Sequence, residues 1–500
     1  MGPTALSQEA RLTRILISNK LCLESLSVAV EGAILKALSI PNPTYVETAT
    51  RMLWTLRRRG VAEAAQPAIL DKMLRGIAPE ICLATPTGKG LEVPRGCLPA
   101  LAPLFKQGVW ESPNPSNIDV TSEVELRGYQ EQFIADLLES SFPFGIPGSG
   151  VGVAPPGSGK TVMGAEIIAR LKTKTLWITH TSALAGQTAE RFRSFLRGPS
   201  IEVIGGGKWK VGDITIALVQ TLFRRDLTPL RDEFGLVIVD ECHHVPARTF
   251  TDVVSAFNPL RMFGLSATPY RKDGLESLMF QALGPQLGRV EKATLVELGF
   301  LIPATILQVT TPCVLSDTID DYADIVKGLH KNRKRTTFIA GDVVAEAKKG
   351  HECIVLVDMI SYGEELRDVI RSSGLTCELV FSTKMAGGTK KKAIATMSSK
   401  ARHEMIERFR SRETSVLVAT YDLLSEGFDH PPLDRLFMTI PVSDKNRALL
   451  EQTLGRLERP SPGKVLALAY DYVDTHKLLL RQAEGRLVLY ESNLMKVLKK

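Results

Sequence analysis

Short apolar runs alternate with longer amphipathic stretches over residues 121–480, and this alternation constrains the fold more than any other feature of the sequence. Apolar, β-branched runs of about four to eight residues, separated by helical patterns, indicate parallel strands that are buried on both faces. The sequence therefore predicts an α/β protein with two consecutive parallel-sheet domains. The predicted strands are GIPGSGVGVAP, TLWITHT, ITIALVQ, GLVIVDE and MFGLSAT in the first domain, and ECIVLVDM, CELVFST, SVLVATY, RLFMTIP and VLALAYDYV in the second.

The remaining residues predict a small accessory domain ahead of the two sheets. Helical patterns occupy residues 19–38 and 45–60, and the stretch 105–120 is rich in Pro, Asn and Ser, as linkers are. A length of 500 residues suits two or three domains of about 100–200 residues each. The predicted boundaries are an N-terminal accessory α+β domain over 1–120, sheet domains over 121–305 and 306–480, and a C-terminal tail over 481–500.

Charge, hydropathy and cysteine usage exclude several classes of protein. A net charge of +7 permits a polyanionic partner without demanding one. No apolar run approaches the roughly 20 residues of a membrane-spanning helix. The seven cysteines are scattered, with no CxxC pair, which argues against zinc ribbons and disulfide scaffolds and for a reducing compartment. We expect a monomer in the cytoplasm of a bacterium or of a virus-infected cell, with no membrane partner.

The stretch GVAPPGSGKTV predicts a phosphate-binding loop between a strand and a helix. Gly157, Ser158 and Gly159 let backbone N–H groups wrap around phosphate oxygens, and the positive end of the following helix adds to the attraction. In this pattern Lys160 reaches the β- and γ-phosphates and the Thr161 hydroxyl holds Mg²⁺. The cofactors predicted from this loop are ATP and Mg²⁺.

The stretch GLVIVDECHHV ends a predicted strand with a cluster of polar side chains. Asp240 is placed to hold the Mg²⁺ shell and Glu241 to position or deprotonate the attacking water. Residues 241–244 could also be read as metal ligands. Neighbouring side chains on an extended strand point to opposite faces, which disfavours that reading. Cys242 is expected to pack into the sheet, and His244 is interpreted as structural.

The ordered set Gly157–Thr161, Asp240–His243 and GLSATPY resembles the first-lobe motifs of the superfamily 2 helicases, with a DECH box at 240–243. The resemblance implies two tandem RecA-like lobes that bind ATP between them. By the same resemblance, His243 links the γ-phosphate site to the second lobe, and Ser266 with Thr268 couples hydrolysis to nucleic-acid binding. The segment LRGYQEQFI is similar to the family's adenine-recognition segment, which makes Arg127 and Gln130 candidates for reading the base. An ordinary helix start remains the alternative for these two residues.

The second domain carries motifs that resemble those of the second helicase lobe. ATYDLLSEGFDHPPLDRLFM looks like motif V, and QTLGRLERP fits the pattern QxxGRxxR. Arginines three apart on a helix share a face, and a guanidinium suits the charge on a transferred phosphoryl group. The resemblance thus places Thr420 near nucleic acid, Gly427 and Asp429 near ribose and γ-phosphate, and Gln452, Arg456 and Arg459 in the catalytic set.

A finer resemblance points to the XPB-like branch of the superfamily. It is strongest over residues 235–305, where the family's Arg-Glu-Asp motif would correspond to Arg271, Lys272 and Asp273, with lysine in place of glutamate. NPTY and LEVPRGCLPAL are similar to the N-terminal DNA-binding module of bacterial and phage relatives. DNA is therefore favoured over RNA. The predicted nucleic-acid contacts are Thr181–Gln187, Gln220, Thr221, the basic segment 387–402, Thr420 and Arg271.

The function predicted from these motifs is an ATP-dependent DNA helicase or translocase that unwinds or remodels DNA. Three alternatives stay open at this stage. The chain could be a duplex translocase without unwinding, such as a restriction or transcription-release motor, or an RNA helicase. It could also be an ATP-switched nucleic-acid-binding module without productive hydrolysis, although such a module predicts a broken hydrolytic set, whereas Lys160, Glu241 and both arginines are present.

Overall fold

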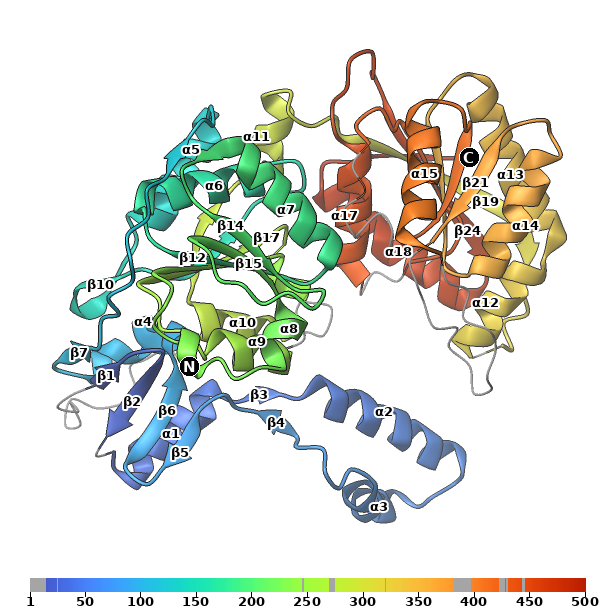
Figure 1. Ribbon diagram of the computed structural model, residues 1–500. Coiled ribbons are helices and arrows are strands. Elements are labelled where there is room, and N and C mark those ends of the chain that lie inside the picture. Colours follow the sequence, from blue (N-terminus) through green and yellow to red (C-terminus); the bar gives the residue numbers. More distant parts are fainter. Residues whose placement is uncertain are drawn as a thin grey trace. The chain divides into compact units, whose positions relative to one another are not determined.

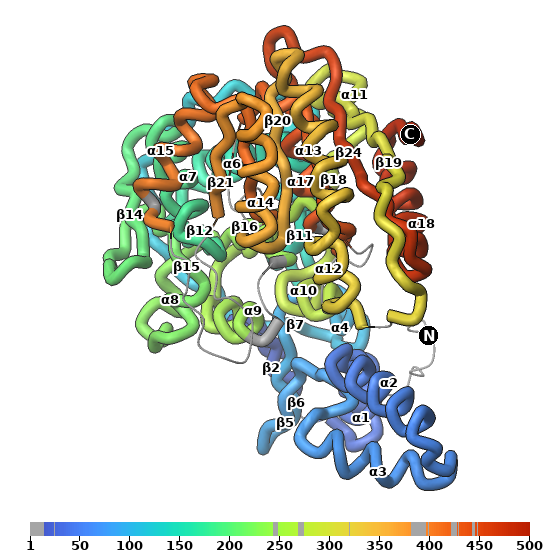
Figure 2. The backbone as a smooth tube through the Cα atoms, turned by 90° about the vertical axis from the view of Figure 1, so that its right-hand side faces the viewer, coloured from blue at the N-terminus to red at the C-terminus, as the bar shows by residue number. Residues whose placement is uncertain are grey.

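The chain forms two compact units. The computed structural model describes residues 15–24, 26–244, 247–268, 275–319, 321–381, 397–421, 428, 430–442 and 446–500. The first unit contains Met1–Ala154 and Lys160–Arg289, and the second contains Pro155–Gly159 and Val290–Lys500. Each unit contains one seven-stranded sheet, visible in Figures 1 and 2.

All neighbouring strands of the first large sheet are parallel, in the order β14-β15-β12-β16-β17-β11-β18. Helices α5, α6 and α7 cover one face, and α8, α9 and α10 cover the other (Figure 1). The bounds are β11 Gly150–Val153, β12 Thr175–Thr179, β14 Ile201–Ile204, β15 Ile214–Leu218, β16 Leu236–Asp240, β17 Arg261–Ser266, β18 Gln286–Arg289, α5 Gly128–Leu138, α6 Lys160–Leu171, α7 Ser182–Phe195, α8 Val219–Phe223, α9 Ala247–Val254 and α10 Glu276–Leu283.

The second large sheet is also parallel throughout, in the order β21-β22-β20-β23-β24-β19-β25. One apolar cluster packs α13 and α14 on one face, and a second packs α15, α17 and α18 on the other. The bounds are β19 Ala304–Val314, β20 Cys353–Val357, β21 Cys377–Val380, β22 Val416–Thr420, β23 Arg435–Met438, β24 Ala467–Thr475, β25 Lys496–Lys499, α13 Arg333–Lys348, α14 Ile360–Arg371, α15 Ser399–Arg410, α17 Arg447–Leu457 and α18 Lys477–Ser492.

The structure confirms the predicted class, which is two tandem parallel-sheet α/β domains and an N-terminal α/β region. The residues 481–500, predicted as a C-terminal tail, contain a helix end and a strand. Residues 481–492 belong to α18, and Lys496–Lys499 form β25. This strand pairs with β19, with Lys496 opposite Thr305, and is an edge strand of the second sheet. Val497 packs against the apolar cluster of that sheet, and this packing stabilises a strand that is too short to be recognised from its sequence.

The N-terminal region is built on a mixed five-stranded sheet in the order β5-β6-β2-β1-β7. Two sequence interpretations are wrong here. The helical pattern at 19–38 is β2 (Lys20–Glu24) followed by α1 (Val28–Leu38), because alternate residues of KLCLE are buried. The interpreted linker at 105–120 contains β7 (Gly108–Trp110), which pairs in parallel with β1 (Ile15–Ile17). The other two strands are β5 Thr85–Thr87 and β6 Gly90–Pro94.

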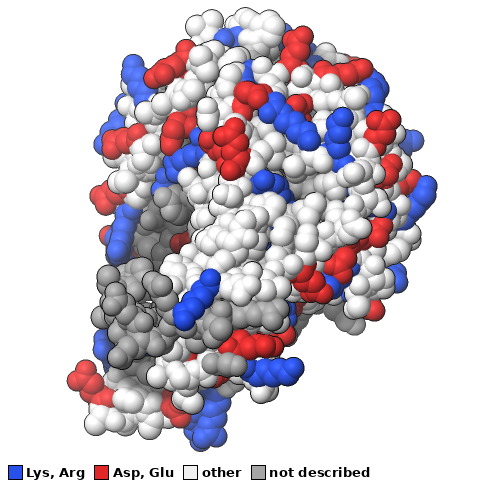
Figure 3. Space-filling model, turned by 90° about the vertical axis from the view of Figure 1, so that its left-hand side faces the viewer, with Lys and Arg blue, Asp and Glu red and all other residues white. Residues whose placement is uncertain are grey.

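Basic and acidic side chains are interspersed on the molecular face in Figure 3. A positive potential strong enough to attract a polyanion requires clustered basic side chains, and basic side chains are not clustered on this face. Among the described residues, no helix combines the length and apolarity needed to cross a membrane.

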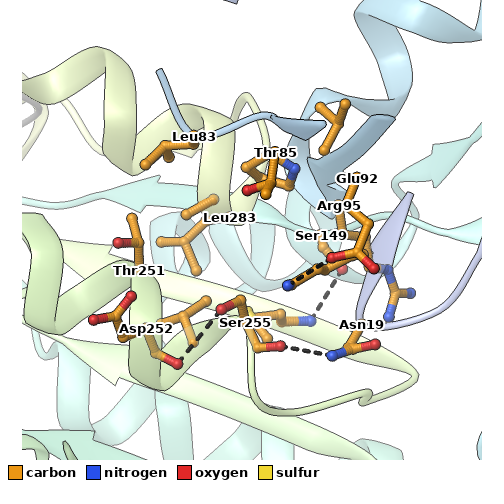
Figure 4. A pocket seen from close by; sticks show the side chains of 16 residues that line it. Asn19, Leu83, Thr85, Glu92, Arg95, Ser149, Thr251, Asp252, Ser255 and Leu283 are labelled. Carbon is orange, nitrogen blue, oxygen red and sulfur yellow. Dashed lines mark hydrogen bonds and ion pairs between the residues drawn. The ribbon is translucent and has the colours of Figure 1, made fainter. Parts of the chain in front are cut away.

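The N-terminal sheet docks on the first large sheet through the turn Arg95–Cys97. The Arg95 guanidinium is buried and donates to the carbonyl oxygens of Pro259 (2.5 Å) and Leu260 (3.2 Å), immediately before β17. Burial lowers the pKa of Arg95 to about 10. Beside this turn lies a cavity of about 150 Å³, shown in Figure 4, where the side-chain amide of Asn19 donates to the Ser255 carbonyl at 2.7 Å. These contacts join the accessory domain to the first lobe as one unit.

The docking contact leaves no room for a side chain at residue 96, so the Gly96→Ala variant is expected to be less stable than the parent. A Cβ atom at residue 96 would lie 2.4 Å from the backbone nitrogen of Gly284 and 2.6 Å from the Gln281 carbonyl oxygen. Forcing backbone apart in a packed interface costs about 1–3 kcal/mol. Thermal unfolding and limited proteolysis should show a less stable, more readily cleaved protein. Gly88→Ala is the matched control, because a Cβ there meets nothing within 4 Å, and equal melting of the two variants would contradict the prediction.

Candidate nucleotide-binding site and motor elements

The predicted phosphate-binding loop lies between β11 and α6. Gly157 and Gly159 have φ angles of +86° and +87°, a region of backbone conformation that glycine adopts without strain. The loop is held by the Ser158 amide, which donates to Pro155 O at 3.2 Å, and by the Ala154 amide, which donates to Ser266 O at 2.8 Å. The second bond ties the loop to the end of the neighbouring strand β17.

Helix α6 starts at Lys160, so its first-turn N–H groups lie directly after the loop. The first four N–H groups of a helix have no partner within the helix, and with the helix dipole they favour a bound anion. The helix packs closely on the sheet at Gly164, where a Cβ would lie 2.4 Å from the Trp177 ring. The Trp177 ring also packs edge-to-face against Phe192 of α7. Trp177 therefore lies in contact with both α6 and α7.

Strand β16 brings both predicted carboxylates to the same edge of the sheet as the loop. Lys160 Nζ lies 3.3 Å from Glu241 Oε1 and also donates to the Ala154 carbonyl at 3.2 Å. β16 ends at Asp240, and Glu241 has a φ of +47°, which is unusual for a residue with a side chain. The premise that residues 241–244 are extended is therefore wrong, because the chain turns at Glu241 and continues as a 3₁₀ turn.

Asp240 is almost completely buried, and burial raises the pKa of its carboxyl group to about 7. The neighbouring Glu241 charge contributes to this rise, and the Lys160 ammonium opposes it. A buried carboxylate with this environment is stabilised by an added cation. The glycine loop, the helix start and the oxygen donors of Asp240, Glu241 and Thr161 therefore fit a phosphate chain with a hard divalent cation.

The raised pKa predicts that Asp240→Asn stabilises the ligand-free protein above neutral pH. Between about pH 4 and pH 7 the unfolded chain releases the Asp240 proton while the folded chain retains it, so the parent loses stability as the pH rises through this window. Asparagine removes that loss. In EDTA and without nucleotide, the Tm of the Asp240→Asn variant should lie about 2 °C or more above that of the parent at pH 8. The gain should shrink toward pH 5, and a variant that melts lower at pH 8 would contradict the assignment.

Three further predicted residues form one hydrogen-bonded group behind the carboxylates. His243 Nδ1 lies 2.7 Å from Ser266 Oγ and 3.6 Å from Glu241 Oε2. Ser266 Oγ donates to the Thr268 carbonyl and accepts from the Thr268 amide. The Ala267 amide donates to Glu241 at 3.4 Å. Direct contacts therefore connect Glu241 to the end of β17. Cys242 is buried in the core beneath β17, as expected.

Two predicted nucleic-acid contacts meet at the carboxyl ends of β12 and β15, which are neighbours in the sheet. Gln220, at the start of α8, donates its side-chain amide to the His180 carbonyl at 3.2 Å. Thr181 caps α7 by accepting from the Leu184 amide at 3.2 Å, and Thr221 follows Gln220. The two segments thus form one polar edge.

Arg127 and Gln130 occupy the start of α5. The Gln130 side-chain oxygen accepts from the Arg127 amide at 3.0 Å, and Arg127 donates to the Tyr129 hydroxyl at 3.3 Å. Gln130 is buried. This arrangement is the capping interaction of an ordinary helix start, the alternative that the sequence left open. It leaves the base-reading role of both residues as a prediction.

In the second unit, α17 carries Gln452, Gly455 and Arg456, and Arg459 follows its end. Sequence reasoning missed the two residues that hold this helix. Glu458 is buried and accepts from Lys292 at 2.7 Å and from the Ala304 amide at 3.0 Å, and burial raises its pKa. Lys464 donates to the carbonyls of Leu457 (2.5 Å) and Arg459 (2.8 Å).

Burial lowers the pKa of Lys464 to about 8. Its position seven residues after the end of α17 fits a cation that satisfies the last carbonyls of a helix. A basic residue shortly after the arginine motif was the one available sequence signal for it. Thr420 ends β22 and is buried. Gly427, Asp429, Arg271 and residues 387–396 of the basic segment lie outside the described residues.

Two family models match the chain. Residues 123–271 match the model described as "Type III restriction enzyme, res subunit", and residues 335–461 match "Helicase conserved C-terminal domain". The first match contains six strands of the first large sheet and the residues Lys160, Asp240 and Glu241, and the second contains β20–β23 of the second large sheet and Arg456.

Relatives with known names are similar over most of the chain. A probable helicase of Escherichia phage T5 is 26% identical over 341 residues, covering 68% of this chain and 70% of the relative. A "DNA 3'-5' translocase XPB2" of Sulfurisphaera tokodaii is 26% identical over 381 residues, covering 70% and 82%. Among solved structures, S. cerevisiae Dbp5 bound to RNA and ADP BeF3 aligns with a TM-score of 0.50 at 13% identity, covering 74% and 89%. At that identity the last likeness shows the fold alone.

The two matched models cover part of each sheet domain, and the topology is that of tandem RecA-like lobes. The first-domain motifs lie at the carboxyl edge of the first sheet in the expected order. The chain belongs to the superfamily 2 helicases, a family of ATP-dependent enzymes that act on nucleic acid.

Proposed function

We propose that the chain is an ATP-dependent DNA translocase of the XPB-like branch that unwinds or remodels DNA. The observation that carries this proposal is the grouping of the first-lobe residues on one sheet edge, where Lys160 Nζ lies 3.3 Å from Glu241 Oε1 and the adjacent Asp240 is buried. The name of the Sulfurisphaera relative, a DNA 3'-5' translocase, supports DNA as the partner and 3'-to-5' as the direction.

In this proposal Lys160 and the backbone of Gly157–Gly159 hold the β- and γ-phosphates. Thr161 and Asp240 hold Mg²⁺, which supplies charge neutralisation at the transferred phosphoryl group when it is bound. Glu241 accepts a proton from the attacking water. Lys160 pairs with Glu241 at 3.3 Å, so a bound phosphate competes with this carboxylate for the same ammonium.

Coupling to DNA follows from the contacts behind Glu241. His243, Ser266 and Thr268 carry a change at the hydrolytic carboxylate to the end of β17. Arg456 and Arg459 supply positive charge to the phosphoryl group in the reacting state, and Gln452 supplies a neutral hydrogen-bonding group. The Gln220–Thr181 edge and Thr420 contact the DNA backbone. Contacts of this type go mainly to phosphates, so we expect little sequence preference and a strong salt dependence.

A strand-displacement assay on matched substrates tests the proposal. DNA duplexes with a 3' or a 5' single-stranded tail, and RNA duplexes of the same sequence, are each incubated with the protein, ATP and Mg²⁺. We expect displacement or ATP hydrolysis to be stimulated most by 3'-tailed DNA. Equal or stronger stimulation by RNA would contradict the assignment of DNA and favour an RNA helicase.

A duplex translocase without unwinding is the second candidate, because the first family model describes a restriction-enzyme subunit. Displacement of a third strand from a triplex separates the two activities. A translocase removes the third strand from blunt duplex DNA without separating the duplex, whereas an unwinding enzyme separates tailed duplexes. Absence of any nucleic-acid stimulation of ATP hydrolysis would contradict both and favour an ATP-switched binding module.

A further inference from the structure

A short segment joins the first large sheet to the second along the chain. Residues 290–303, which we call the connector, run from the end of β18 to the start of β19 and contain α11 (Lys292–Glu297; Figure 1). Leu295 and Leu301 of the connector are buried, and Ile302 packs on the apolar cluster to which α17 contributes. The connector and α17 belong to the same compact unit. The connector therefore packs on the helix that carries the motif arginines.

Glu458 accepts hydrogen bonds from both ends of the connector and from the first residue of β19. Lys292 Nζ lies 2.7 Å from Glu458 Oε1, and the Ala304 amide donates to the same oxygen at 3.0 Å. The Ile302 amide donates to the Glu458 carbonyl at 2.8 Å. Lys292 stands near the beginning of the connector and Ile302 near its end. A single residue of the arginine motif thus binds the connector at two separate points.

Neither charge of the Lys292–Glu458 pair lies where it would stabilise its own helix. Glu458 is the C-cap of α17, and an anion at the C-terminal end of a helix opposes the helix dipole. Lys292 is the first residue of α11, where a cation is unfavourable for the same reason. The Glu458 carboxylate is buried, and burial raises its pKa, while the Lys292 ammonium opposes the rise. The contact between the connector and α17 accounts for this pair, and local helix stability does not.

We propose that Glu458 is a positioning residue, which ties the positions of Arg456 and Arg459 to the connector through its pair with Lys292. Arg459 follows Glu458 directly and Arg456 precedes it by two residues, so a displacement of residue 458 displaces both arginines. A misplacement of about 1 Å near the reacting atoms can lower a rate about a hundred-fold. The inference deepens the proposed function and rests on it, because the role of the two arginines at the phosphoryl group comes from that proposal.

The double variant Lys292→Met/Glu458→Gln tests this role, because it removes both charges and keeps the side chains close to their original size. Glutamine still accepts from the Ala304 amide, and replacing a buried ion pair by uncharged residues is often neutral for stability. The Tm should therefore lie within about 4 °C of that of the parent. In DNA-stimulated ATP hydrolysis, kcat should fall about tenfold or more, while KM for ATP should change by no more than about twofold. Lys292→Arg keeps the charge and should retain most of the parental kcat.

The dependence on the arginines is the sharper test. In an Arg456→Gln/Arg459→Gln background, the groups that Glu458 positions are absent. Adding Lys292→Met/Glu458→Gln to this background should lower kcat no further, because the effects of residues that act as a unit are not additive. A further loss of about tenfold in this background would show that Glu458 does not act through the arginines, and would overturn the proposal.

The matched control is Lys500→Met/Asp342→Asn, which removes another lysine–carboxylate pair of the second unit, with Nζ and Oδ1 3.0 Å apart. It should hydrolyse ATP at the parental rate. An equal loss in this control would show a general effect of removing an ion pair from the unit and would overturn the proposal. Parental kcat in Lys292→Met/Glu458→Gln would also overturn it.

The temperature dependence separates positioning from a purely structural role. A large fall in the Tm of Lys292→Met/Glu458→Gln, with kcat restored at a lower assay temperature, would show that the pair only holds the fold, which again contradicts the proposal. If the parent shows no DNA-stimulated hydrolysis, or if Arg456→Gln/Arg459→Gln keeps full activity, the proposed function itself fails. The positioning role then falls with it, a result distinct from the failure of the Lys292–Glu458 pair alone.

Discussion

The Glu241→Gln variant is expected to hydrolyse ATP at least about a hundred-fold more slowly than the parent in the presence of DNA while still binding ATP. Glutamine keeps the size of the side chain and its contact with the Ala267 amide, and removes only the ability to accept a proton. General-base catalysis contributes about 10²–10⁴-fold to a rate. Phosphate release measured with and without DNA gives the loss, and equilibrium binding of a fluorescent ATP analogue shows that the site remains.

Lys160→Ala should behave differently from Glu241→Gln, and the difference is the sharper test. Lys160 is the cation of the site, so its removal should weaken ATP binding as well as abolish hydrolysis. Glu131→Gln is the control, because Glu131 is an exposed carboxylate that pairs with Arg170 on the surface. It should hydrolyse ATP at the parental rate. Full activity in either Glu241→Gln or Lys160→Ala would contradict the assigned roles.

The strands that carry the site could be predicted because their residues are buried on both faces. β16 reads LVIVD and β22 reads VLVAT, and every residue of both strands is buried. Edge strands lack this signal. β18 (QLGR) and β25 (KVLK) contain too few buried residues to show a pattern, and each becomes a strand only because a neighbouring strand offers a free edge.

The candidate site likewise has parts that the sequence predicts and parts that it does not. The loop around Lys160 and the pair Asp240–Glu241 follow local patterns, so the sequence alone places them at strand ends. The left-handed backbone at Glu241 and the supports of α17 depend on distant parts of the chain. Glu458 bonds to Lys292, which is 166 residues away, and no spacing rule in the sequence relates the two.

Two buried ion pairs in the second unit could not be predicted either, because their arginines look like ordinary surface residues. Arg335 lies in the basic stretch HKNRKRTT, yet it is fully buried and bonds to both carboxylate oxygens of Asp474, at 2.6 and 2.9 Å. It also donates to the Thr439 carbonyl at 2.6 Å. Arg486 pairs with Asp471 at 2.8 Å and donates to the Val442 carbonyl at 3.2 Å.

Both arginines therefore fix the segment 439–442, which leaves β23 and precedes the helix α17 with its two motif arginines. Burial alone would lower the pKa of Arg335, but the paired carboxylate outweighs it and raises the pKa. The pair is thus ionised, and its two charges depend on each other. Breaking one pair should both unfold the second unit more easily and misplace Arg456.

Arg335→Met is expected to destabilise the second unit by about 3–5 kcal/mol, because it leaves the Asp474 carboxylate buried without its cation. The double variant Arg335→Met/Asp474→Leu should be more stable than Arg335→Met, since no buried charge remains. Lys327→Met, which removes one partner of an exposed pair with Asp324, is the control and should unfold at the same urea concentration as the parent. Urea unfolding measures all three, and DNA-stimulated hydrolysis should fall in Arg335→Met. If the double variant is less stable than Arg335→Met, the buried charge is not the cause of the loss, and the ion pair does not hold this part of the fold.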